Sequence, residues 1–283
     1  MSFQAVKRRL GKPYYSANGC LIYNMDCMEA MQSLPNKAFD LTVTSPPYNI
    51  GKEYEDNRSL DEYLDWCEEW VDEIHRLTKD DGSFWLNLGF IPTEEGRIPI
   101  PYLLWDRVNF FLVQEVVWHY TAGVNCRNWL SPRNEKFLWY IKDEDNYTFN
   151  LDNIRDPDVK YPNQKKNGKL KVNQKGKNPT DVWTVKKVTS GENRAADERT
   201  DHPAQYPVTV IARIVRGCSN EGEIVFDPFI GSGTTAEAAI DSGRKVVGFD
   251  IEKEYCDIAA NRLDEFISHK RAEEAQIDLF PSS

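Results

Sequence analysis

The sequence has no paired cysteines and no long apolar run. Its six cysteines are scattered over 283 residues without a CxxC pair, so we expect neither a disulfide framework nor a zinc site. The chain opens without a secretory apolar stretch, and no apolar run approaches the roughly 20 residues that cross a bilayer. These absences predict a cytoplasmic protein with no membrane partner.

The composition is that of a globular protein with a sizeable core. Hydrophobic residues make up 40% of the chain and charged residues 28%. We favour one large α/β domain with an insertion over two small domains. Strand patterns alternate with helical patterns, which predicts a doubly wound, mostly parallel sheet. Seven strands are expected near 20–24, 39–44, 83–88, 111–118, 136–141, 223–227 and 245–250. Helices are expected over 60–78, 206–217, 234–242 and 255–267.

Charge is distributed unevenly along the chain. The net charge of −10 argues against a nucleic-acid partner at first sight, because DNA binding depends on neutralising phosphates. The segment 155–187, however, holds ten basic residues and three acidic ones. It lies in a stretch, 151–200, that is rich in Asn, Lys, Pro and Gly and has no periodicity, which predicts an insertion made of loops. This insertion is either a solvated loop or an electrostatic footprint for nucleic acid.

A glycine-rich turn follows the strand predicted over 223–227. The run DPFIGSGTTAEAA at 227–239 leads into a helix, and Gly231 and Gly233 let the backbone approach a ligand closely. The third glycine of a dinucleotide-binding turn is missing. The next strand ends in Asp250, where a carboxylate can bond both ribose hydroxyls of an adenosine. A strand-end Asp alone is often a helix N-cap, but beside this turn it favours an adenosine cofactor.

The string TSPPYN at 44–49 directly follows a buried-strand pattern. Two consecutive prolines cannot continue a strand, so they hold a rigid loop at the carboxyl edge of the sheet, where ligands bind. There Ser45 Oγ and the Pro46 carbonyl form adjacent acceptors, with the ring of Tyr48 close by. A Pro-Pro-Tyr string is otherwise typical of a polyproline ligand, and the buried strand before it argues against that interpretation.

Together these motifs resemble those of the amino-group DNA methyltransferases, whose catalytic loop reads (D/N/S)PP(Y/F) and whose cofactor loop reads FxGxG. Residues 45–48 and 229–233 match the two patterns. Because the catalytic motif comes first, the order resembles the β class, a circular permutation of the usual arrangement. The resemblance implies S-adenosylmethionine as cofactor and a seven-stranded, Rossmann-like methyltransferase fold. It also implies a catalytic half (1–120), a target-recognition insertion (121–200), a cofactor-binding half (201–270) and a C-terminal tail (271–283).

The resemblance assigns roles to particular residues. The amino nitrogen of a base is a poor nucleophile, and acceptors at Ser45 Oγ and Pro46 C=O are expected to draw it toward tetrahedral geometry. Tyr48 is expected to stack on the flipped base, and Phe229 to pack beside the sulfonium. The predicted catalytic residues are Ser45, Pro46, Pro47 and Tyr48. The predicted cofactor-binding residues are Asp26, His202, Gln205, Asp227, Phe229, Gly231, Gly233, Thr234 and Asp250.

Contacts with DNA are expected between 120 and 200, where Arg and Asn side chains can read base edges or bind the backbone. The predicted residues are Arg127, Asn128, Arg133, Lys165, Lys166 and Lys169. Serine at position 45 is met more often in cytosine-N4 enzymes. The segments 44–52 and 145–150 resemble adenine-N6 enzymes, so we favour adenine N6 and keep cytosine N4 as the alternative.

Three other functions fit parts of the pattern. The intact motif at 45–48 argues against a DNA-binding regulator without turnover. The basic insertion and the permuted order argue against a methyltransferase that acts on RNA or on a protein amide, and the incomplete glycine pattern argues against an NAD-dependent dehydrogenase. His75 and His119 lack partners at metal-ligand spacing, so no metal is assigned. The expected partner is double-stranded DNA. A second copy, through the acidic, aromatic segment 61–70, is a further candidate partner. The sequence leaves open whether the protein acts alone or with a cognate restriction endonuclease. The protein is expected on the nucleoid.

Overall fold

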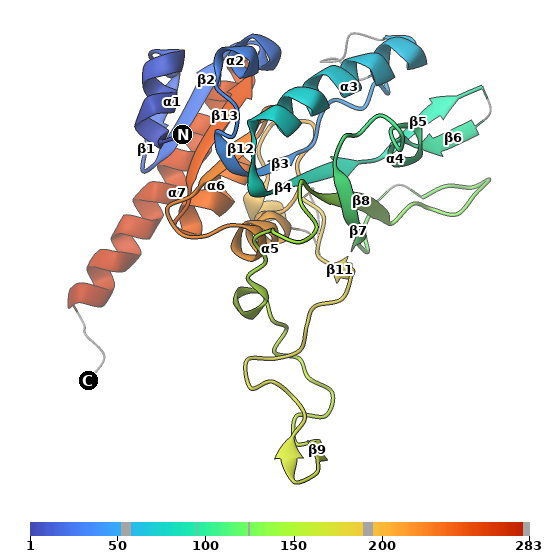
Figure 1. The fold of residues 1–283 in the computed structure, drawn as a ribbon, viewed down its shortest axis with the longest axis vertical. Coiled ribbons are helices and arrows are strands. Elements are labelled where there is room, and N and C mark those ends of the chain that lie inside the picture. The colour runs from blue at the N-terminus through green and yellow to red at the C-terminus, as the bar shows by residue number, and fades with distance from the viewer. Residues whose placement is uncertain (52–57, 95, 124, 189–194, 280–283) are drawn as a thin grey trace.

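A nine-stranded sheet forms the centre of the computed structural model, which describes residues 1–51, 58–94, 96–123, 125–188 and 195–279 (Figure 1). The strand order is β1 (Tyr15–Ala17), β2 (Cys20–Asn24), β13 (Lys245–Asp250), β12 (Ile224–Asp227), β3 (Phe39–Thr44), β4 (Thr78–Leu88), β8 (Asn134–Ile141), β7 (Phe111–His119) and β11 (Val182–Thr184). In this order, the strands from β2 through β13, β12 and β3 to β4 are all parallel to one another. Strand β8 is antiparallel to both of its neighbours, β4 and β7.

All seven predicted strands lie in this sheet, which confirms the α/β fold class. The expected number of strands was too low, because β1 and β11 add one short strand at each edge. Each of these spans three residues, too few to show a period in the sequence. Two hairpins lie outside the main sheet: β5 (Phe90–Thr93) with β6 (Gly96–Pro99), and β9 (Lys165–Lys166) with β10 (Lys169–Leu170).

Helices cover both faces of the sheet, and a separate buried cluster lies under each set. One face carries α1 (Phe3–Leu10), α2 (Cys27–Ser33) and α3 (Leu60–Leu77), and the other carries α5 (Val208–Cys218), α6 (Thr234–Asp241) and α7 (Lys253–Leu279). The short elements are α4 (Ile100–Leu103) and two 3-10 turns, Leu151–Asn153 and Ala196–Glu198. The chain is therefore doubly wound, as predicted.

The helix α3 forms where the apolar spacing predicts it. Ser59 and Glu62 make a capping box at its start, and Trp70 and Ile74 are fully buried on its inner face. The helix α7 is longer than predicted and continues to Leu279, so most of the expected tail is helical. Lys52 and residues 280–283 lie outside the described residues.

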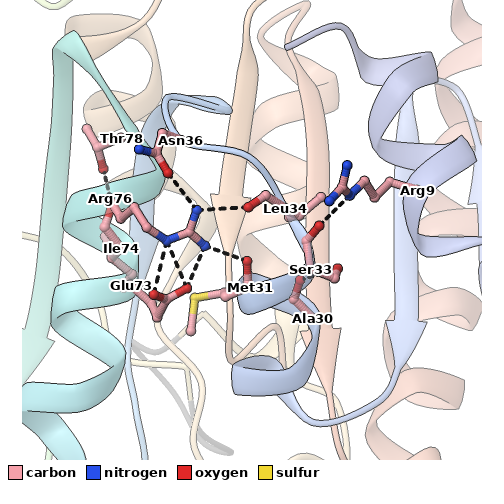
Figure 2. A network of polar contacts seen from close by, with 10 residues as sticks. All are labelled: Arg9, Ala30, Met31, Ser33, Leu34, Asn36, Glu73, Ile74, Arg76 and Thr78. Carbon is pink, nitrogen blue, oxygen red and sulfur yellow. Dashed lines mark hydrogen bonds and ion pairs between the residues drawn. The ribbon is translucent and has the colours of Figure 1, made fainter.

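Arg76 joins α2 to α3 (Figure 2). Its guanidinium donates to the carbonyls of Met31 and Leu34 at 2.7 and 2.8 Å, and it pairs with Glu73 at 2.6 Å. The carbonyls at the end of a helix have no partner within the helix, so this side chain satisfies acceptors that α2 leaves open. The contact holds α2 and α3 together near the amino ends of β3 and β4, which begin at Phe39 and Thr78.

The segment 151–181 forms an arm that projects from the body of the protein (Figure 1). Its base is fixed where the backbone N–H of Asn150 donates to Gly217 and where Asp156 bridges Lys177. The hairpin of β9 and β10 forms its far end. The stretch 151–200 is mostly irregular, as predicted, but Val182–Thr184 within it form β11, and residues 189–194 lie outside the described residues. In the part of the chain that is described, no helix has the length and apolarity to span a membrane.

Candidate active site

The predicted motifs meet along one edge of the sheet. The strands from β2 to β4 are parallel, so the residues that follow them gather at their shared carboxyl edge. Strand β8 is antiparallel to β4 and pairs Lys136 with Leu88, which brings the loop before β8 to the same edge. We call this the active edge; across it lie Asp26, Asp250, the 227–233 turn, the 45–48 loop and the 120–133 loop.

Hydrogen bonds hold the 45–48 loop between α3 and β4. Ser45 Oγ lies 3.1 Å from the Tyr48 hydroxyl, which lies 3.0 Å from Asn87 Oδ1. Tyr63 donates its hydroxyl proton to the Pro47 carbonyl at 2.9 Å. Pro46 is buried, whereas Ser45 is only half-buried. The four predicted catalytic residues therefore form one braced loop, as the precise placing of two acceptors requires.

The ring of Tyr48 lies against the backbone of Gly89. A Cβ atom at position 89 would come within 2.9 Å of Tyr48 Cε2, so a glycine is needed at this point. Asn87 and Gly89, at the end of β4, thus position Tyr48, and no sequence motif predicts either of them. A signal for Asn87 does exist: it is a polar side chain in an apolar strand, and at 1% exposure it must find a partner inside the protein.

A buried hydrogen bond joins the catalytic and cofactor motifs. Thr44 at the end of β3 donates to Asp227 Oδ1 at 2.6 Å, across 183 positions of sequence. Asp227 also accepts from the backbone N–H of Phe229 at 3.1 Å and from the Tyr206 hydroxyl at 3.3 Å. Burial raises the pKa of Asp227 to about 6. The neighbouring Tyr206 is neutral, so it supplies no positive charge that would lower this pKa.

The glycine turn has the backbone that a close ligand approach requires. Gly231 and Gly233 have φ of 47° and 77°, which favours glycine. A Cβ at Gly231 would lie 2.9 Å from His202 Nε2, so the glycine lets this ring pack directly against the turn. The His202 ring is 4.3 Å from that of Tyr255. His202 is therefore placed beside the turn, as predicted, and burial lowers its pKa.

Two carboxylates lie at the carboxyl ends of adjacent strands: Asp250 is the last residue of β13, and Asp26 comes two residues after β2. Asp250 accepts the backbone N–H of Gly231 on one oxygen and that of Glu252 on the other, both at 3.0 Å. Burial raises the pKa of Asp250 to about 6. Asp26 caps α2 by accepting the N–H of Met28 at 2.8 Å. Because Asn24 pairs with Asp250, Asp26 lies one strand away from Asp250 at the active edge.

An aromatic wall stands between the cofactor turn and the catalytic loop. The ring of Phe229 lies 5.5 Å from Trp70 and 5.7 Å from Trp66. The Arg58 guanidinium lies 4.7 Å above the Trp66 ring, so this wall already attracts a cation. Rings of this kind suit a sulfonium for the same reason. The apolar spacing around Trp66 predicts only packing against the sheet, so its contact with Phe229 was not predicted.

Two predicted cofactor ligands are occupied within the protein. Thr234 is 1% exposed, and its hydroxyl accepts from Arg262 at 3.0 Å. The amide of Gln205 donates to the Glu198 carbonyl at 2.7 Å and accepts from Thr200 at 3.1 Å. Both residues hold the turn and the segment before α5 in place.

The predicted DNA-binding residues fall into two separate groups. Arg127, Asn128 and Arg133 lie in the 120–133 loop at the active edge, and the first two are exposed. Arg133 donates to Asn125 at 2.9 Å, which braces the loop. Lys165, Lys166 and Lys169 are exposed in the hairpin at the far end of the arm (Figure 1).

The described residues include no cluster of three or more His, Cys, Asp or Glu side chains arranged to hold a metal ion. The groups at the active edge suit an adenosine and a sulfonium. They are a half-buried carboxylate at a strand end, a glycine turn with left-handed φ and a group of aromatic rings.

The fold and the active edge define a Rossmann-like methyltransferase of the amino-group class. A family model described as DNA methylase, of the N6/N4 group, matches residues 39–261, and the chain belongs to that family. This confirms the predicted resemblance, and with it S-adenosylmethionine as the methyl donor.

Curated relatives agree with this assignment. The type II methyltransferase M.ScaI of Streptomyces caespitosus is 56% identical over 261 residues, which cover 92% of this chain and 86% of the relative. The DNA adenine methyltransferase YhdJ of Escherichia coli (strain K12) is 35% identical, over 89% of this chain and 85% of the relative.

Solved structures share the fold. The cytosine-N4-specific PvuII DNA methyltransferase superposes with a TM-score of 0.70 at 20% identity, covering 89% of this chain and 88% of that one. M1.HpyAVI in complex with SAM gives a TM-score of 0.57 at 24% identity, over 86% and 98% of the two chains.

Proposed function

We propose that this protein is a site-specific DNA methyltransferase that methylates the exocyclic N6 of adenine in duplex DNA by base flipping. The observation that supports this most is the hydrogen bond between Thr44 and Asp227, which sets the acceptor loop beside the glycine turn. A methyl donor held by the turn and a base held by the loop then share one edge. The relative YhdJ, which carries adenine in its name, supports the choice of base.

The chain's own acceptors activate the nucleophile. Ser45 Oγ and the Pro46 carbonyl each accept one amino N–H, which localises the lone pair on nitrogen. When bound, S-adenosylmethionine would supply an electrophilic methyl group on a sulfonium, whose sulfur would keep the electron pair of the C–S bond. As the N–C bond forms, the amino nitrogen releases one proton through these acceptors to solvent. Tyr48 holds the base in plane by stacking.

Cofactor binding is expected to weaken in acid. Asp250 must be ionised to accept two ribose hydroxyls, and its pKa is about 6. Protonation below pH 6 therefore raises the dissociation constant for S-adenosylmethionine, toward about tenfold per pH unit. Titration calorimetry between pH 5 and 8 measures this. Asp250→Asn should bind weakly at every pH and lose most of the slope; a wild-type affinity that is flat down to pH 5 would contradict the assignment.

Exposed side chains of the 120–133 loop support DNA contact at the active edge. Leu130 and Trp129 are 94% and 57% exposed, and the Arg97 guanidinium lies 5.4 Å above the Trp129 ring. The loop carries two arginines and no acidic residue. Apolar tips beside cationic side chains are typical of protein segments that enter DNA grooves or base steps.

The lysine arm is expected to contribute affinity without sequence preference. Replacing Lys165, Lys166 and Lys169 by alanine should weaken binding to target and non-target duplexes by the same factor, since phosphate contacts do not depend on the base sequence. The slope of log affinity against log salt should become shallower by up to about 0.9 for each phosphate that the arm neutralises. Fluorescence anisotropy over a salt series tests this, with Arg127→Ala as the comparison at the active edge. An unchanged slope would show that the arm does not touch DNA.

Cytosine N4 is the second candidate target, and Ser45 in the first position of the catalytic loop favours it. Two acceptors suffice for either amino group, so the loop geometry serves both bases. Nucleoside mass spectrometry of DNA methylated in vitro decides between them. N6-methyladenine supports the proposal, and N4-methylcytosine keeps the mechanism but replaces the base. The dimer and the cognate endonuclease remain predictions.

A further inference from the structure

Asn87 is a buried amide next to the catalytic loop. Its Nδ2 donates to the backbone carbonyl of Lys136 in β8 at 3.0 Å. A carbonyl can only accept, so this bond fixes which end of the amide is nitrogen and directs Oδ1 toward Tyr48. The pairing of β4 with β8 therefore places the amide oxygen of Asn87, and not its nitrogen, opposite the Tyr48 hydroxyl.

The hydroxyl proton of Tyr48 is directed by Asn87. The Tyr48 oxygen lies 3.0 Å from Asn87 Oδ1 and 3.4 Å from the Asn87 carbonyl oxygen, and both of these atoms can only accept. Tyr48 must donate its single proton toward them, since otherwise two acceptors would face a third oxygen with no proton between them. Its oxygen is then an acceptor toward Ser45, 3.1 Å away.

We infer that Asn87 is a positioning residue that orders the protons of Tyr48 and Ser45 so that Ser45 can only accept a hydrogen bond from the amino group of the base. This inference rests on the proposed function. Ser45 donates its own proton to Tyr48 and presents its lone pairs to the incoming amino group. A serine hydroxyl, unlike a carboxylate, carries a proton that could otherwise point at the amino nitrogen and occupy the lone pair needed for attack. The Lys136–Asn87–Tyr48–Ser45 chain removes that competing hydrogen bond.

Single-turnover methyl transfer measures the effect, with wild-type protein and Asn87→Leu at saturating S-adenosylmethionine and DNA. The leucine has a similar size and no acceptor, so the rate should fall about tenfold while both dissociation constants stay within twofold. Tyr48→Phe removes the hydroxyl through which Asn87 acts on Ser45. The double variant Tyr48→Phe/Asn87→Leu should transfer no more slowly than Tyr48→Phe alone.

A second background separates proton ordering from packing. In the Ser45→Asp variant the acceptor is a carboxylate, which has no proton to order. The double variant Ser45→Asp/Asn87→Leu should therefore transfer methyl groups as fast as Ser45→Asp alone. An Asn87→Leu rate equal to wild type overturns the inference, and so does an Asn87 effect that persists undiminished in the Tyr48→Phe background. These outcomes differ from a failure of the proposed function, in which the wild-type protein transfers no methyl group to DNA.

Discussion

Ser45→Ala is expected to lower the single-turnover rate of methyl transfer by about 100-fold while leaving the affinity for S-adenosylmethionine within twofold. The Ser45 hydroxyl is one of two acceptors that localise the amino lone pair, and loss of one preorganised partner of a reacting group costs rate in this range. The residue lies on the catalytic loop, across the Thr44–Asp227 hydrogen bond from the cofactor turn. The substitution should therefore separate chemistry from cofactor binding.

Rapid-quench transfer of labelled methyl to a saturating duplex gives the rate for Ser45→Ala. Ser33→Ala is a suitable control, because the Ser33 hydroxyl also makes a hydrogen bond, to the Ala30 carbonyl at 2.7 Å, but Ser33 ends α2, away from the active edge. The control should keep the wild-type rate. A Ser45→Ala rate within threefold of wild type would mean that the amino group is activated elsewhere.

Asp250→Ala is expected to raise the dissociation constant for S-adenosylmethionine about 100-fold. Two hydrogen bonds from ribose hydroxyls to a carboxylate contribute about 3 kcal/mol together. The same carboxylate accepts the N–H of Gly231, so its loss also loosens the glycine turn. Both effects act on binding, and the rate at saturating cofactor should change little.

Calorimetry with wild type, Asp250→Ala and Glu252→Ala measures this effect. Glu252 is a matched control, because it carries an exposed carboxylate only two residues away from Asp250 and meets Asp250 through its backbone N–H, which the substitution keeps. Glu252→Ala should bind as wild type does. Equal affinities for all three proteins would place the ribose elsewhere on the edge.

The placing of the two motifs was predictable because it depends only on strand direction. TSPPYN and DPFIGSG each follow a buried strand, and the carboxyl ends of parallel strands share an edge. The permuted order did not disturb this, since β12 and β3 pair directly although 183 residues separate Thr44 from Asp227. Asp250 was predictable for the same reason, as the end of β13.

Side-chain partners were less accessible from the sequence. Asn87 acts on Tyr48 only because β4 pairs with β8, a long-range antiparallel pairing that no local pattern specifies. Thr234 matches the family motif and yet bonds Arg262 of α7, which lies close only in the folded protein. The grouping of lysines and arginines in one basic region concealed that the arm and the 120–133 loop occupy different parts of the molecule.

The most direct test is a crystal structure of the protein with its target duplex and a non-transferable analogue of S-adenosylmethionine. The proposed arrangement predicts a flipped base whose amino nitrogen lies about 3 Å from both Ser45 Oγ and the Pro46 carbonyl oxygen, with the base stacked on Tyr48. A duplex that keeps its target base stacked, or a flipped base whose amino group meets neither acceptor, would contradict it.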